Sequence, residues 1–291
     1  MKLPALRIGD LIAKLPIIQG GMGVGISLSG LASAVANEGG IGVIAAAMIG
    51  MGEPDIATNP LEANIRALKN EIRKARNLTK GLLGVNIMVA LTHFSNLVVA
   101  AIEEGIDFIF SGAGLPLDLP KYLGRQSKPK LVPIVSSGRA AEVLCKKWAK
   151  LSYLPDAFVV EGPLAGGHLG LKPEQISSPE FTLEKLVAEV LAAVKPFEAE
   201  AGRAIPVIAA GGVYSGADID KYLKMGAAGV QMATRFVATH ECDASPEFKQ
   251  AYINAAEEDI VIINSPVGLP GRAINNEFLK AVKRGEKIPF T

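Results

Sequence analysis

The chain has 291 residues, of which 49% are hydrophobic and 20% are charged, and its formal net charge is +1. This length suits one large domain with a deep core, and the even charge balance argues against a nucleic-acid partner, which would favour a basic surface stripe. Apolar runs are short and broken by glycine, and the N-terminus lacks a signal-like apolar stretch, so we expect neither membrane insertion nor secretion. Cys145 and Cys242 lack metal-ligand spacing, so no metal site is expected and a cytoplasmic location is the simplest setting.

Eight short apolar runs, most of them rich in β-branched residues, end in glycine or small polar residues. Their hydrophobicity is continuous rather than alternating, which is typical of strands buried on both faces of a parallel sheet. In chain order these predicted strands are residues 16–19, 41–44, 83–87, 108–110, 131–135, 157–160, 206–209 and 229–232.

Segments with helical spacing separate the predicted strands. The stretch 115–123 is the weakest of them, because Pro116 and Pro120 leave room for only a short or irregular helix. Strand and helix then alternate eight times, which predicts an α/β fold, a closed (β/α)8 TIM barrel. An open doubly wound sheet is the alternative, since one miscounted strand would remove the closure. The other predicted helices are residues 28–37, 61–76, 95–104, 139–150, 182–195 and 216–224.

No linker or low-complexity tract divides the chain, so we expect a single domain over residues 1–291. The barrel would occupy about 14–240, and a short C-terminal helical extension about 241–291. Within that extension we expect peripheral helices at 247–257 and 275–283, around a Gly/Pro-rich crossing at 265–271.

Functional residues are expected after the strands, because TIM-barrel active sites form at the carboxyl ends of the strands. The loop after the sixth strand presents His168 among glycines, where an α/β enzyme would place an acid or base. Small residues after strands seven and eight fall where barrels bind phosphate through backbone N–H groups. This predicted phosphate cradle consists of Gly211, Gly212, Ala233 and Thr234.

Other polar residues near the same rim have two readings. His93 follows the third strand and could line the mouth or begin the next helix. Ser136 and Ser137 follow the fifth strand and could reach the substrate pocket, whereas His240 is predicted to be a solvated loop residue. The glycine run after the first strand lacks the third glycine of a nicotinamide fingerprint, because Leu28 stands in its place.

Five motifs, taken in order, resemble the nitronate monooxygenase (2-nitropropane dioxygenase) family of FMN-dependent TIM barrels. That family also contains flavin-dependent enoyl-acyl-carrier-protein reductases and some NADH:quinone reductases. The resemblance extends from about residue 16 to residue 236. Its motifs are IIQGGM at 17–22, GVNIM at 84–88, AGGHLG at 165–170, PVIAAGG at 206–212 and QMATRF at 231–236.

The resemblance implies a noncovalently bound FMN whose phosphate lies on the predicted cradle. The isoalloxazine ring would lie over Gly21 and Met22, with Asn86 and Gln231 available to hydrogen-bond its polar edge. Glu161 and Gly167 match positions near the cofactor, and His168 matches the family's catalytic histidine. The plainer readings are a capped strand end for Asn86, a core amide for Gln231 and core filling for Met22.

The resemblance leaves three functions open. The first is oxidation of alkyl nitronates with O2 to a carbonyl compound and nitrite, with His168 as the base. The second is an NAD(P)H-dependent flavin reductase of enoyl thioesters or quinones, and the third is a barrel that binds FMN without turnover. In each case the expected partner is a small molecule, and a homodimer is left open.

Overall fold

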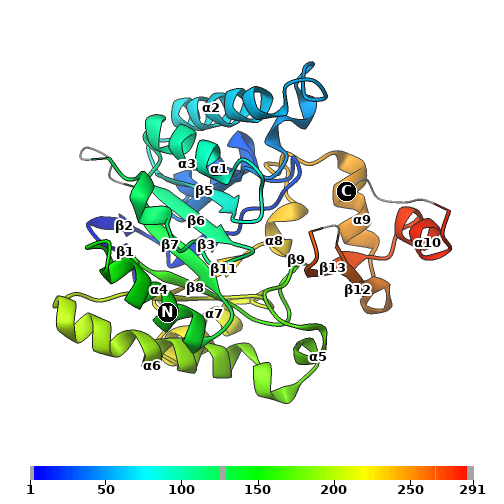
Figure 1. Ribbon diagram of the computed structural model, residues 1–291. Helices are drawn as coiled ribbons and strands as arrows, with labels where there is room; N and C mark the ends of the chain where they lie inside the picture. The colour runs from blue at the N-terminus through cyan, green and yellow to red at the C-terminus, as the bar shows by residue number, and fades with distance from the viewer. Residues whose placement is uncertain (1–2, 125–128, 266, 287–291) are drawn as a thin grey trace.

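A computed structural model describes residues 3–124, 129–265 and 267–286, and its centre is a closed barrel of eight parallel strands (Figure 1). The strands follow the order β10-β11-β3-β4-β5-β6-β7-β8 around the barrel. All eight predicted strands are present. This confirms the TIM-barrel prediction and excludes the alternative of an open doubly wound sheet. The barrel strands are β3 (Ile17–Gln19), β4 (Ile41–Ala45), β5 (Leu82–Met88), β6 (Phe108–Gly112), β7 (Lys130–Val135), β8 (Phe158–Glu161), β10 (Val207–Ala210) and β11 (Gly229–Met232).

Helices surround the barrel, with α2 and α6 the longest of them (Figure 1). The predicted weak segment contains only a 3-10 turn, η2 (Leu119–Tyr122), as its two prolines indicated. Helix α6 runs six residues past the predicted end at Lys195 and contains Pro196; in the added segment, Phe197 packs against the buried core. The outer helices are α1 (Ser29–Asn37), α2 (Pro60–Leu78), α3 (Phe94–Glu103), α4 (Gly138–Ala149), α6 (Leu183–Ala201) and α7 (Gly216–Lys224).

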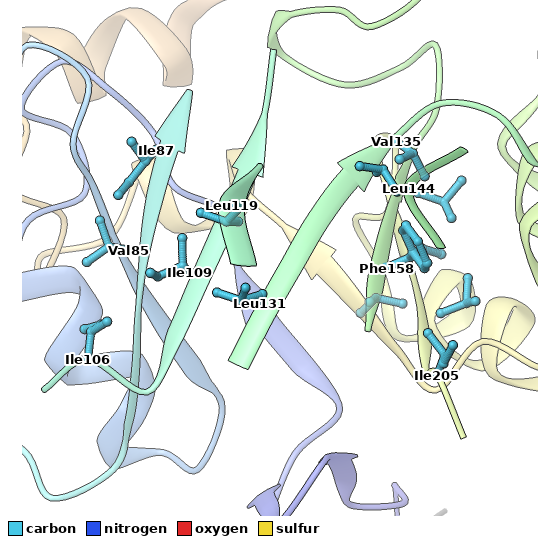
Figure 2. Close-up of a cluster of buried hydrophobic side chains, with 14 of the residues drawn as sticks. Val85, Ile87, Ile106, Ile109, Leu119, Leu131, Val135, Leu144, Phe158 and Ile205 are labelled. Atoms are coloured by element: carbon cyan, nitrogen blue, oxygen red, sulfur yellow. The ribbon is translucent and has the colours of Figure 1, made fainter. Parts of the chain in front are cut away.

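Two apolar layers hold this architecture together. One fills the barrel, where Phe108 and Phe110 are both fully buried. The other lies between the strands and the surrounding helices, and Figure 2 shows part of it, with Val85, Ile109 and Leu131 on neighbouring strands. Burial of each such side chain contributes about 1.5–3 kcal/mol. The rim residues therefore stand on a rigid base.

The N-terminal end of the barrel is closed by a hairpin that the sequence analysis did not anticipate. Strands β1 (Leu6–Ile8) and β2 (Leu11–Ala13) pair antiparallel, and Leu6 and Ile8 join the apolar cluster inside the barrel. The hairpin covers the end of the barrel opposite to the predicted site (Figure 1).

The C-terminal extension contains the two predicted helices, as α9 (Pro246–Asn254) and α10 (Glu277–Lys283). Between them the structure adds a hairpin that was not predicted, made of β12 (Ile260–Asn264) and β13 (Pro270–Ile274). Its turn occupies the Gly/Pro-rich crossing, of which residue 266 lies outside the described residues. Strand β13 also pairs with β9 (Gly167–His168), which brings the extension to the barrel rim (Figure 1).

No helix in the described part of the chain combines the length and the apolar character that crossing a membrane requires.

Candidate active site

The structure brings the predicted ring-binding residues together at the carboxyl ends of the strands. Gly21, just past β3, packs against Asn86 on β5 so closely that a Cβ at position 21 would overlap the Cβ of Asn86. The same atom would lie 3.1 Å from the Asn86 Cγ. On the other side, a Cβ at Gly20 would lie 3.4 Å from the Gln231 Cγ and 3.5 Å from the Ala233 Cβ. The glycines that follow β3 therefore contact Asn86 of β5 on one side and Gln231 of β11 on the other.

The loop that carries Met22 is held in place by Ser27. The Met22 N–H donates to the Ser27 Oγ at 2.8 Å, and the Ser27 N–H donates back to the Met22 carbonyl at 3.0 Å. Met22 is half-buried and packs on the apolar cluster that includes Ile26 and Leu31, so its core-filling role is present. The hydrogen bonds to Ser27 therefore hold the backbone of Met22 in place.

The predicted phosphate cradle shows why glycines follow β10. Gly211 and Gly212 have φ values of +91° and +86°, which side-chain-bearing residues rarely adopt. A Cβ on Gly211 would lie 2.9 Å from the Ala165 backbone N, and one on Gly212 would lie 2.9 Å from the Leu164 Cβ. The β10 loop and the loop after β8 are therefore in direct backbone contact.

The other half of the cradle follows β11. Ala233 occupies the position before the short helix α8 (Thr234–Val237), and Thr234 is its first residue and is exposed. Next to it, the Arg235 guanidinium carbon lies 4.6 Å from the centre of the Tyr214 ring, in a cation–π contact between the loops after β11 and β10. This contact was not predicted.

His168 is half-buried on β9, a strand of two residues, and it pairs with Gly271 of β13. Burial lowers the pKa of His168 below its usual 6.5. The imidazole is therefore largely neutral at pH 7, which is the form that accepts a proton.

Glu161 ends β8, beside Ala210 of β10. Burial raises the pKa of Glu161 to about 7, although a hydrogen bond from the Gly170 backbone N–H acts in the opposite direction. Ser136 meets the same backbone, since a Cβ at Gly170 would lie 2.7 Å from the Ser136 Oγ. Glu161 and Ser136 thus both contact the end of the histidine loop.

Three further residues named in the sequence analysis, Ser137, His93 and His240, differ in their surroundings. Ser137 caps α4, because its Oγ accepts the Ala140 N–H at 3.2 Å. His93 precedes α3 but its side chain makes no capping bond. His240 is exposed, as predicted.

A family profile of nitronate monooxygenases matches residues 6–290. The chain belongs to this family. Its members are oxidoreductases, and the predicted resemblance is confirmed over nearly the whole chain.

Named relatives and solved structures agree with this membership. The chain is 30% identical over 272 residues to a (3aS,4S,5R,7aS)-5-hydroxy-7a-methyl-1-oxo-octahydro-1H-indene-4-carboxyl-CoA dehydrogenase of Mycobacterium tuberculosis, covering 94% of this chain and 66% of that protein. It is 29% identical to a probable nitronate monooxygenase of Staphylococcus aureus, covering 93% and 78%. The chain thus spans about two thirds to three quarters of these relatives' lengths.

Two solved structures share the fold. FabK from Thermotoga maritima superposes with a TM-score of 0.71 at 30% identity, over 93% of this chain and 74% of that one. Nitroalkane oxidase from Streptomyces ansochromogenes gives a TM-score of 0.73 at 24% identity, over 92% and 79%. The second likeness shows the fold alone.

Three residues at the rim of this nitronate monooxygenase-family barrel escaped the sequence analysis. Gln19 is fully buried, and its Oε1 accepts the Val43 N–H at 2.9 Å, which ties β3 to β4. The Asp243 carboxylate accepts three backbone N–H groups at the start of α1 at 2.7–3.1 Å, and Arg272 of β13 donates to the loop after β8. Asp243 and Arg272 look like ordinary surface charges in the sequence, so only their packing identifies them.

The rim offers polar groups of the kind that a flavin cofactor would use. The glycines that contact Asn86, Leu164 and Ala165 let the strand-end loops pack closely, with backbone N–H groups that carry no side chain beside them. Asn86 and Gln231 supply amides that can both donate and accept hydrogen bonds. Among the residues that the structure describes, no group of three His, Cys, Asp or Glu side chains could hold a metal ion.

Proposed function

We propose that this member of the nitronate monooxygenase family is an FMN-dependent enzyme that oxidises alkyl nitronates with O2, with His168 as its base. The observation that carries the proposal is the half-buried His168 on β9, whose lowered pKa keeps it neutral. It belongs to the loop that packs against Gly211 and Gly212. A proton acceptor and a glycine-lined anion site thus share one loop.

The residues divide into three groups around the cofactor. The phosphate would rest on Gly211, Gly212, Ala233 and Thr234, through backbone N–H groups and one hydroxyl. The ring would lie over Gly21 and Met22, with Asn86 and Gln231 at its polar edge. Glu161 and Gly167 would lie near the cofactor, where Glu161, whose pKa is about 7, can hold a proton.

Neutral nitroalkanes carry a proton on the carbon next to the nitro group, whereas nitronates have already lost it. His168 would remove this proton and so convert a nitroalkane into the reactive nitronate. FMN, when bound, supplies the redox chemistry. The overall reaction balances when two nitronates and one O2 give two carbonyl compounds and two nitrite ions.

Comparison of the two substrate forms tests the role of His168. We expect His168→Ala to lower turnover of a neutral nitroalkane by about 10²–10⁴-fold, the usual contribution of a general base. Turnover of the preformed nitronate should fall far less, because its proton is already gone. Equal turnover of the nitroalkane by the variant and the wild type would rule out His168 as the base. Copurifying flavin, measured by absorbance and identified as FMN after release, tests the cofactor.

A second candidate, NAD(P)H-dependent reduction of an enoyl thioester or quinone, is favoured by the 30% identity to FabK. Anaerobic mixing separates the two functions. Rapid bleaching of the bound flavin by a nitronate supports the oxidase, whereas bleaching by NADH or NADPH but not by a nitronate supports the reductase. Bound flavin that none of them reduces would leave a binding protein.

A further inference from the structure

The strand that carries His168 has little support from its own part of the chain. Strand β9 has only two residues, and Gly167 adopts a φ of +70°. Its regular hydrogen-bonding partner is β13, about 100 residues later in the sequence, with Gly271 opposite His168 and Arg272 opposite Gly167. The Leu169 N–H also donates to the Pro270 carbonyl at 2.8 Å. The position of His168 therefore depends on the C-terminal hairpin.

Arg272 adds a second attachment at the other end of the loop. One guanidinium nitrogen, Nη1, donates to the Pro163 carbonyl at 2.7 Å and to the Ala165 carbonyl at 3.2 Å. Burial lowers the pKa of Arg272, and no carboxylate of the described chain forms an ion pair with it. The side chain is half-buried, and both of these hydrogen bonds go to this loop.

The Arg272 side chain lies on the other side of the small sheet from the His168 imidazole. Residues paired across an antiparallel sheet point to the same face and their neighbours to the other, so Arg272 and His168 lie on opposite faces of the small sheet. The carbonyls that Arg272 binds flank Leu164, whose side chain packs against Gly212. One guanidinium thus fixes the segment between His168 and the phosphate cradle.

We propose that Arg272 is a positioning residue that holds the Pro163–Leu169 loop, and with it His168, at the distance that proton removal requires. This inference rests on the proposed function of His168. Hydrogen bonds from a charged donor are stronger than neutral ones, and their loss would leave two loop carbonyls without a partner. A displacement of about 1 Å at a reacting group can cost about 10²-fold in rate.

The test compares Arg272→Ala and Arg272→Lys with the wild type as purified flavoproteins. With a neutral nitroalkane we expect kcat to fall by about 10–100-fold in Arg272→Ala, with KM changing much less. Arg272→Lys should recover part of kcat, because an ammonium can still donate to one or both carbonyls. With the preformed nitronate, both variants should stay within about threefold of the wild type.

A matched control is Arg284→Ala, which removes an exposed arginine of the same extension that pairs with Glu286. It should leave both substrates unaffected. If His168→Ala abolishes nitroalkane turnover while Arg272→Ala leaves it intact, the positioning role is wrong and the proposed function stands. If His168→Ala has no effect, the proposed function fails first. A uniform loss with both substrates in Arg272→Ala and Arg272→Lys would mean general support of the fold, and would also overturn the inference.

Discussion

Glu161→Gln should stabilise the protein, and the gain should depend on pH. The pKa of Glu161 is raised to about 7, against an ordinary value of 4.5. The folded state therefore binds this proton more tightly than the unfolded state does. Below about pH 4.5 the carboxyl is protonated in both states and costs nothing. As the pH rises from 4.5 to 7, ionisation is penalised in the folded state only, and stability is lost.

The full difference between these pKa values corresponds to about 3 kcal/mol. Glu161 is partly accessible to solvent, which reduces the effect, so we expect about 1–3 kcal/mol above pH 7. Glutamine cannot ionise, and its Oε1 can still accept the Gly170 N–H. At pH 8 the variant should therefore be more stable by this amount, and at pH 5 the gain should be small.

Urea unfolding of the flavin-free protein at pH 5 and pH 8 measures the difference. Comparison of the variant with the wild type at each pH cancels the contributions of other titrating groups. Glu184→Gln serves as a control of opposite sign, because hydrogen bonding to Lys221 lowers the pKa of Glu184 to about 2. That variant should lose similar stability at both pH values. A stability gain for Glu161→Gln that is equal at pH 5 and pH 8 would refute the burial argument.

Three further predictions concern the packing of individual residues. Gly21→Ala should destabilise the protein by about 1–3 kcal/mol and lower FMN retention, because the new methyl group overlaps Asn86. Thermal unfolding measures the loss of stability, and the absorbance of bound flavin measures FMN retention. The control Gly52→Ala should change neither quantity, because a Cβ at Gly52 would have no atom within 4 Å. Ser137→Ala removes the cap of α4 and should cost about 1 kcal/mol in urea unfolding without altering turnover; a large loss of turnover would return Ser137 to the substrate pocket. Cys145 is fully buried, and burial raises the pKa of its thiol to about 12. Iodoacetamide should therefore label Cys145 in the native protein only at the rate at which the protein unfolds. Labelling that is faster than unfolding would contradict its burial.

The barrel was predictable because its signals are local. A run such as Val207–Ala210 is apolar throughout, and residues 211 and 212 then require the positive φ that glycine adopts readily. Both properties depend on a few neighbouring residues. The small residues of α1 and Gly42 of β4 likewise allow the helix and the strand to pack closely, since a Cβ at Gly42 would overlap the Ala32 carbonyl.

The hairpin β12–β13 was missed because its decisive contacts are distant in sequence. The run Ile260–Asn264 is short and half-exposed, and nothing near it in the sequence indicates that β13 pairs with residues 167–168. The three N–H groups that bind Asp243 lie more than 200 residues away. A charged residue in a loop has no local feature that distinguishes such a role from solvation.

The sequence by itself thus determined the order of the barrel strands and their helices, the glycine positions at the rim and the position of His168 after the sixth barrel strand. The expected loop at His168 was wrong, because residues 167–168 form the short strand β9 against β13. Periodicity and backbone conformation carry that information, and both are properties of adjacent residues. Only the tertiary structure decided what holds His168, which serine caps a helix and why the pKa of Glu161 rises. Hydrogen-bond pairing and desolvation depend on which segments pack together, and that is settled only when the whole chain has folded.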